Sequence, residues 1–246
     1  MTILVTRPEP AASQLVTRLQ AAGKLAWSLP LIEFAPGGDL PHLAQQLQAL
    51  KPGDLVFLLS QQVIFHAHPA MQHAGAAWPT IPDYYAIGRS TALAFHTVSN
   101  LPVEYPQAEE TSEELVRLGR LHNVAGKRAL LLRGNGGRTL IADTLSERGA
   151  NVSFIECYQR RAKQYDGAFE GHRWRNRGID TLVVSSGEML QQLYSLFPTV
   201  DREEWLLHCR LLVVSERLAT LAAGLGWQNI TVADGADNDA LLRALR

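Results

Sequence analysis

Short runs of apolar residues alternate with longer segments of helical periodicity along the 246 residues of this chain. Runs such as 54–59 and 128–132 have the length and the apolar content of buried strands. Segments such as 11–22 space their apolar residues at i, i+3 and i+4, which indicates a helix with one buried face. Strands that alternate with helices of this length form βαβ units, so the sequence predicts an α/β fold with mostly parallel sheets.

Glycines and acidic residues mark several predicted helix ends. Gly23 and Gly149 are expected to end helices, and Ser112 is expected to cap one whose first turn carries acids. A polar, basic stretch separates residue 158 from residue 181. Strands are predicted at 3–6, 25–34, 54–59, 84–87, 103–105, 128–132, 152–158, 181–184, 211–214 and 230–232, and helices at 11–22, 61–68, 90–98, 112–121, 137–148, up to 196, up to 225 and from near 238.

The order of elements repeats within the chain. Arg7 and Arg133 each follow an apolar strand and precede a helix, 126 residues apart, and Ser60 and Ser186 are related by the same offset. This match rests more on the shared order of strands and helices than on identical residues at the paired positions. We therefore expect two copies of one α/β unit of about five strands, each the size of a small domain.

Composition excludes several classes of function. Hydrophobic residues make up 46% of the chain, and the net charge of -1 provides no general basic field for a nucleic acid. Cys157 and Cys209 are expected to be buried free thiols, since two cysteines form no disulfide framework. The N-terminus lacks a signal-peptide pattern and no apolar run is long enough to span a membrane, so we expect a cytoplasmic protein.

Small, hydroxylic and cationic residues follow the predicted strands. The carboxyl ends of parallel strands carry the functional loops, and helix starts there favour anions. A cleft between the two units is the expected site. Its candidate binding residues are Arg7, Ser60, Gln61, Gly88, Ser90, Thr91, Arg133, Gly134, Asn135, Ser185, Ser186, Gly187 and Ser215.

Each candidate also has a purely structural interpretation. The segment 133–138 (RGNGGR) is either an anion-binding loop or a glycine-rich turn, and the serines either cap helices or present amides to a carboxylate. Arg7 before Pro8 is either an anion contact or a structural arginine. Tyr158, where the chain passes between the units, either fills the interface or points its hydroxyl into the cleft as a weak acid.

Motifs of other chemistries are missing. The chain has no catalytic triad pattern, no histidine spacing typical of a metal site and no nucleotide-binding fingerprint. The sequence therefore predicts neither a metal nor a cofactor.

Seven segments of the chain form a set that is specific through its order and spacing rather than through any single member. These segments are 3–8 (ILVTRP), 30–34 (PLIEF), 86–92 (AIGRSTA), 126–137 (GKRALLLRGNGG), 156–160 (ECYQR), 182–190 (LVVSSGEML) and 211–217 (LLVVSER). In this set the chain resembles bacterial uroporphyrinogen-III synthases over its whole length.

The resemblance implies two flavodoxin-like parallel-sheet domains joined by a two-stranded β connector. It places one discontinuous domain at 1–35 plus 178–246 and the other at 36–163, with connector strands near 29–35 and 154–162. The repeat alone suggests a division near residue 124 instead.

The resemblance also implies an activity. The enzyme would be a cofactor-free lyase of haem biosynthesis that dehydrates and cyclises hydroxymethylbilane to uroporphyrinogen III. Ring D would be inverted through a spiro intermediate, whereas the unassisted bilane closes to the type I isomer. By position, Tyr158 matches the tyrosine that the family uses as donor to the leaving hydroxyl, and the candidate loops would hold the carboxylate arms. Glu216, where relatives often carry small residues, weakens the case for the Ser215 loop.

The resemblance further implies a monomer, with transient contact to hydroxymethylbilane synthase as a plausible handover of an unstable substrate. The alternative function is a two-lobed small-anion binding protein without catalysis. A cofactor enzyme or sugar transferase is disfavoured because it would need a nucleotide fingerprint.

Overall fold

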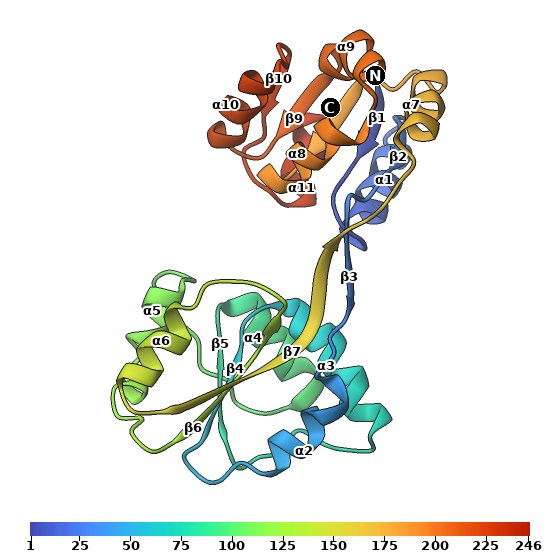
Figure 1. The fold of residues 1–246 in the computed structure, drawn as a ribbon. Coiled ribbons are helices and arrows are strands. Elements are labelled where there is room, and N and C mark those ends of the chain that lie inside the picture. The colour runs from blue at the N-terminus through green and yellow to red at the C-terminus, as the bar shows by residue number, and fades with distance from the viewer. The chain divides into compact units, whose positions relative to one another are not determined.

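The computed structural model describes residues 1–246. The chain forms two compact units (Figure 1). The first unit comprises Met1–Glu33 with Arg161–Arg246, and the second comprises Phe34–Arg160. The segment 164–177, which the sequence analysis assigned to neither domain, belongs to the first unit.

The sheet of the first unit has the order β10-β9-β8-β1-β2, and all neighbouring strands are parallel. Counted along this unit, the order is the 2-1-3-4-5 arrangement of flavodoxin-like folds. Strand order reverses between β1 and β8, which is the switch point of this sheet. The strands are β1 (Thr2–Val5), β2 (Leu25–Ser28), β8 (Thr181–Val184), β9 (Arg210–Val213) and β10 (Ile230–Val232).

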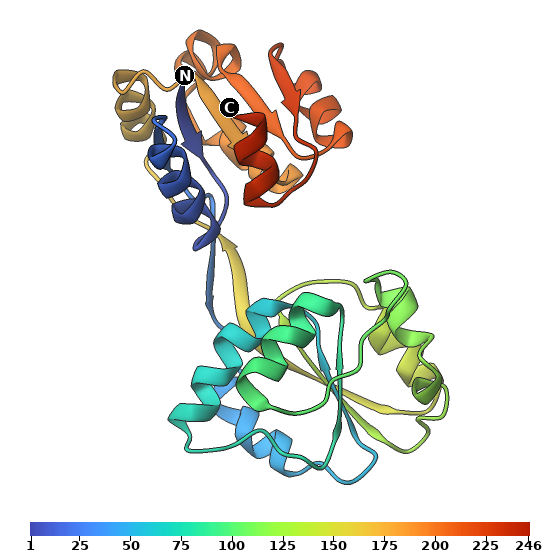
Figure 2. The ribbon, with the colours of Figure 1, turned by 180° about the vertical axis from the view of Figure 1, so that it is seen from behind.

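Alternate residues of the central strands serve two cores. Leu4 and Leu182 join the core under α8 and α10, whereas Val5 and Val183 join the core under α1 and α11. Helix α11 covers the face turned to the viewer in Figure 2. The helices of this unit are α1 (Ala11–Ala21), α7 (Gly167–Asn176), α8 (Gly187–Leu196), α9 (Thr199–Glu204), α10 (Glu216–Leu225) and α11 (Asn238–Ala244), with the 3-10 helix η3 (Leu206–His208).

The sheet of the second unit has the order β3-β7-β6-β4-β5. Strands β7, β6, β4 and β5 are parallel, and their order reverses between β4 and β6. The backbone N–H of Gly37 donates to Cys157 and that of Lys163 to Leu31, so β3 runs antiparallel to β7. The strands are β3 (Ile32–Pro36), β4 (Leu55–Leu58), β5 (Asp83–Ala86), β6 (Arg128–Gly134) and β7 (Asn151–Ala162).

Helices cover both faces of this second sheet. Val56 and Leu130 face the core under α2, α3 and α4, whereas Phe57 and Leu131 face the core under α5 and α6. Two sheets of mainly parallel strands with helices on both faces confirm the predicted flavodoxin-like architecture. The helices are α2 (Leu43–Gln48), α3 (Gln61–His73), α4 (Arg89–Ser99), α5 (Ser112–Val116) and α6 (Leu140–Glu147), with the 3-10 helices η1 (Leu40–His42) and η2 (Gly119–Leu121).

Several predicted elements differ from the structure. The single strand predicted at 25–34 is two strands, β2 and β3, which belong to different sheets. The predicted strand at 103–105 is reduced to one bridge between Tyr85 and Glu104. The polar stretch before residue 181 contains α7, which was not predicted. No helix has the length and apolar character that a membrane span requires.

Two helix starts were also predicted wrongly. The cap of α5 is Thr111, not Ser112, because the Thr111 hydroxyl accepts from the N–H of Glu114 at 3.2 Å. Helix α6 begins at Leu140 rather than at Gly137, whose φ of 123° is incompatible with a helix.

Gly37 lies where the chain leaves β3 and touches β7. A Cβ atom on Gly37 would overlap the backbone carbonyl of Glu156, whereas a Cβ on Gly38 would meet nothing within 4 Å. We expect Gly37→Ala to destabilise the protein by about 1–3 kcal/mol through this overlap, and Gly38→Ala to cost little. Urea unfolding of both variants measures the difference, and equal stabilities would contradict this packing.

Both cysteines are free and buried, as predicted. Burial raises the pKa of the Cys157 thiol and of the Cys209 thiol to about 12. Folded thiols therefore keep protons that unfolded thiols release above the ordinary value of 9.0. Their contribution to stability is complete below this value and is lost as the pH rises toward 12.

This dependence of stability on pH can be measured. Between pH 8 and pH 10 the free energy of unfolding should fall by about 1 kcal/mol per buried thiol. The double variant Cys157→Ala/Cys209→Ala should show a smaller fall in urea titrations. An equal fall in both proteins would mean that the thiols do not cause it.

Candidate functional site

The switch point of the second unit lies between β4 and β6. Ser60 follows β4, and Gly134 is the last residue of β6. Tyr158 lies on β7, the next strand of the sheet. Ligands of open α/β sheets bind outside the carboxyl ends of the strands at such a reversal of strand order.

An irregular register between β6 and β7 places Tyr158 there. Arg133 pairs with Glu156, but the next residue, Gly134, pairs with Tyr158, so Cys157 is the extra residue of a β-bulge. Side chains normally alternate along a strand, yet Cys157 and Tyr158 both pack against the core under α3 and α4. A bulge of this kind turns a side chain toward a new direction.

The Tyr158 hydroxyl forms one hydrogen bond within the protein. The Ser60 hydroxyl donates to it at 3.0 Å. The ring stacks on His66 and meets Phe34 edge-on, each at 5.8 Å between centroids. A Cβ on Gly134 would lie 2.6 Å from the Tyr158 ring, so this position needs glycine. The site is thus one hydroxyl pair held between aromatic rings and backbone.

A cavity of about 200 Å³ adjoins Tyr158 on the side of α6. Its polar lining includes Ser112, Arg133 and Arg138. The Arg133 guanidinium stacks 3.9 Å above the Phe154 ring, and Arg138 forms an ion pair with Glu113. The segment 133–138 therefore lines a cavity, and both of its arginines already have partners. It does not lead directly from β6 into a helix, because α6 begins only at Leu140.

Other candidates of this unit already have partners. The side-chain amide of Asn135 donates to the backbone of Arg160 and accepts from it, so it extends the strand pairing. Thr91 is buried within α4. Gln61 and Ser90 lie in the first turns of α3 and α4, and Gly88 is the residue before α4. The N–H of Arg89 donates to the carboxylate of Glu110 at 2.9 Å.

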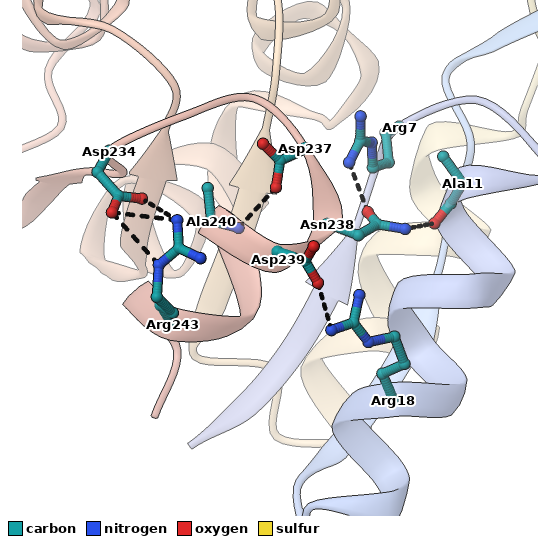
Figure 3. A network of polar contacts seen from close by, with 9 residues as sticks. All are labelled: Arg7, Ala11, Arg18, Asp234, Asp237, Asn238, Asp239, Ala240 and Arg243. Atoms are coloured by element: carbon teal, nitrogen blue, oxygen red, sulfur yellow. Dashed lines mark hydrogen bonds and ion pairs between the residues drawn. The ribbon is translucent and has the colours of Figure 1, made fainter.

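The first unit contains the remaining candidates. Arg7 follows β1 at the switch point, and its Nη1 donates to Oδ1 of Asn238 at 2.5 Å (Figure 3). Asn238 in turn donates to the carbonyl of Ala11, which ties α11 to α1. Burial lowers the pKa of Arg7, opposed by the charge of Asp237. Its Nε is buried without a partner, so this guanidinium has unused donor capacity.

Two of the candidate serines in this unit are helix caps. Ser186 caps α8 by accepting from Met189, and Ser215 caps α10 by accepting from Leu218. Ser185 precedes the cap and Gly187 starts α8. Ser60 differs from these serines because it makes no side-chain cap and contacts Tyr158 instead.

Sequence analysis missed three neighbours of the candidate site: His66, Phe34 and Glu110. The sequence analysis considered the histidines only by their metal-site spacing, and the structure has no group of three or more His, Cys, Asp or Glu side chains that could hold a metal ion. His66 lies four residues after Gln62 on the first turns of α3, and its Nδ1–H donates to the Gln62 carbonyl at 2.9 Å.

The fit of Gly134 against Tyr158 is testable. Gly134→Ala should push the ring from Ser60 and lower about tenfold any activity that depends on the position of the Tyr158 hydroxyl. Gly119→Ala, where a Cβ meets nothing within 4 Å, is the matched control in the same unit. Full activity of a folded Gly134→Ala variant would show that this contact is dispensable.

These features define a class of protein. The chain is a doubly wound α/β protein that carries the flavodoxin-like arrangement twice, with a tyrosine–serine pair at one switch point and an arginine at the other.

The comparisons identify the family. The model of "Uroporphyrinogen-III synthase HemD" matches residues 13–243. The uroporphyrinogen-III synthases of Salmonella typhimurium and Escherichia coli are each 62% identical over 246 residues, which covers 100% of both chains. That of Proteus mirabilis is 45% identical over 195 residues, 79% of this chain and 98% of its own.

Solved structures share the fold. A mutant uroporphyrinogen III synthase from Thermus thermophilus matches with a TM-score of 0.62 at 16% identity, over 100% of this chain and 99% of the other. The chain belongs to the uroporphyrinogen-III synthase family, and it is an enzyme of tetrapyrrole biosynthesis.

Proposed function

We propose that the chain converts hydroxymethylbilane to uroporphyrinogen III with Tyr158 assisting departure of the terminal hydroxyl. The observation that carries this assignment is the hydrogen bond from Ser60 to Tyr158 at the switch point of the second sheet. A phenol has one hydrogen to donate. Ser and Tyr hydroxyls can each donate or accept, and when Ser60 donates to the phenol oxygen, the phenol hydrogen is available for a substrate oxygen.

The acid step is a small part of the task. Loss of the hydroxyl leaves an electrophilic terminal carbon, and ring D must then be attacked at its substituted carbon for the spiro route to form. An unassisted bilane closes without inversion, so the enzyme must hold the chain folded. Orientation of this kind contributes more to the rate than a single proton transfer does.

The carboxylate arms need several weak anion contacts. In the second unit, Ser60, Gln61, Gly88, Ser90, Arg133 and Gly134 lie at or next to strand ends and helix starts. In the first unit, Arg7, Ser185, Ser186, Gly187 and Ser215 have the corresponding positions. Free N–H groups and the dipole of a helix start favour carboxylates even where the serine side chain is a cap. Thr91 and the Asn135 side chain are weaker candidates, because both are already packed or bonded.

We further propose a monomeric enzyme of the cytoplasm that receives its unstable substrate from hydroxymethylbilane synthase. Two free, buried thiols are compatible with a reducing compartment. Gel filtration and a coupled assay with the upstream enzyme test the oligomeric state and the handover.

The activity itself is tested with freshly made hydroxymethylbilane. The product is oxidised and the uroporphyrin isomers are separated. Predominant type III is expected. Type I at the rate without enzyme, from folded protein, would favour the non-catalytic anion-binding alternative.

Tyr158→Phe separates the acid role from orientation. We expect a loss of turnover of about 10- to 100-fold, at or below the lower end of the range for one general acid, with type III still the main product. Tyr84→Phe is the control, because it removes a hydroxyl that bonds to Pro79 in the same unit. Loss of all type III formation from a folded Tyr158→Phe protein would mean that Tyr158 contributes more to the reaction than one acid step.

A further inference from the structure

A carboxylate of the protein itself occupies the start of α4. The N–H of Arg89, the first residue of this helix, donates to Oε1 of Glu110 at 2.9 Å. This N–H has no partner within the helix, as expected for a first-turn donor. Glu110 is 21 residues away along the chain, in the exposed segment 107–110.

Gly88 makes room for this carboxylate. A Cβ at this position would overlap Oε2 of Glu110 and would lie 2.6 Å from its carboxyl carbon. The backbone of Gly88 is extended, so glycine is not required there by its φ angle. The missing side chain serves the close approach of a carboxylate to the helix start.

The same segment places a second carboxylate on the candidate site. Glu113, three residues further on, pairs with Arg138, which lines the cavity beside Tyr158. The pairing lowers the pKa of Glu113 through its hydrogen bond to Arg138. Two anion-binding groups of the second unit, the N–H of Arg89 and the guanidinium of Arg138, are therefore bound to Glu110 and Glu113.

We propose that Glu110 is an internal placeholder for a carboxylate arm of the substrate, and that substrate binding displaces it from the start of α4. This inference rests on the proposed function, which puts the substrate's arms at these helix starts. The contact is suited to exchange, because a surface carboxylate at a helix start is held only weakly. Release of Glu110 also frees the segment that carries it, while Thr111 keeps α5 capped.

Glu109 supplies a matched control. It lies next to Glu110 in the same exposed segment, and the N–H of Arg89 donates to Glu110 and not to Glu109. Glu109→Ala and Glu110→Ala remove the same charge from neighbouring positions. Any effect of net charge on a polyanionic substrate is therefore equal in the two variants.

The experiment compares steady-state conversion of hydroxymethylbilane to type III product by these variants. Glu110→Ala should have a KM about two- to fivefold below that of Glu109→Ala, the fold-change that corresponds to a carboxylate at a helix start, with kcat unchanged. A KM equal to or above that of Glu109→Ala, with normal type III formation, overturns the placeholder and leaves the proposed function standing. If Tyr158→Phe and Gly134→Ala are both fully active, the proposed site itself fails.

Amide hydrogen exchange at Arg89 is a second readout that does not depend on turnover. The Arg89 amide should exchange slowly in the free wild-type enzyme and faster in Glu110→Ala. Saturating uroporphyrinogen III should restore slow exchange in the variant, because a ligand carboxylate then accepts from this N–H. Fast exchange that the ligand does not change would mean that Glu110 is only a structural cap of α4.

Discussion

The bulge between β6 and β7 is the constraint on which the candidate site depends. Arg133 pairs with Glu156 and Gly134 with Tyr158, so the ladder skips Cys157. Without this skip, Tyr158 would lie on the opposite face of the sheet from Cys157. With it, the phenol reaches Ser60, which lies after a different strand, at a distance of 3.0 Å. Glycine at 134 is the second condition, since any Cβ there would meet the ring.

Much of the anion-binding capacity of the free chain is used by its own side chains. Glu110 accepts at the start of α4, Glu113 pairs with Arg138, and Asn238 accepts from Arg7. Where water is excluded, a helix-start N–H or an arginine without a hydrogen-bond partner would lower the stability of the folded chain. The contacts of Glu110 and Glu113 are exposed, and exposed contacts of this kind are individually weak. An enzyme whose main task is orientation benefits from many such exchangeable contacts more than from one strong one.

The internal repeat explains why the two units are interleaved. The offset of 126 residues relates β1 to β6 and β4 to β8. In the structure, β1 pairs with β8 and β4 pairs with β6, so each sheet joins one central strand from each copy. The ends of the chain therefore share one unit and the middle forms the other. A division at residue 124, between tandem copies, would separate the central strands of both sheets.

The sequence by itself determined the local elements and the kind of residue at each strand end. Periods of two and 3.6 residues are local, so the alternation of strands and helices, the parallel sheets and the position of Ser60 after β4 could all be predicted. Long-range pairing has no such local signal. Only the tertiary structure decided that residues 25–34 divide between two sheets, that Cys157 bulges, and that Ser186 caps a helix whereas Ser60 binds Tyr158. The divided strand, the bulge and the roles of the two serines all depend on which distant groups form hydrogen bonds with these residues. Such groups come into reach only in the folded chain.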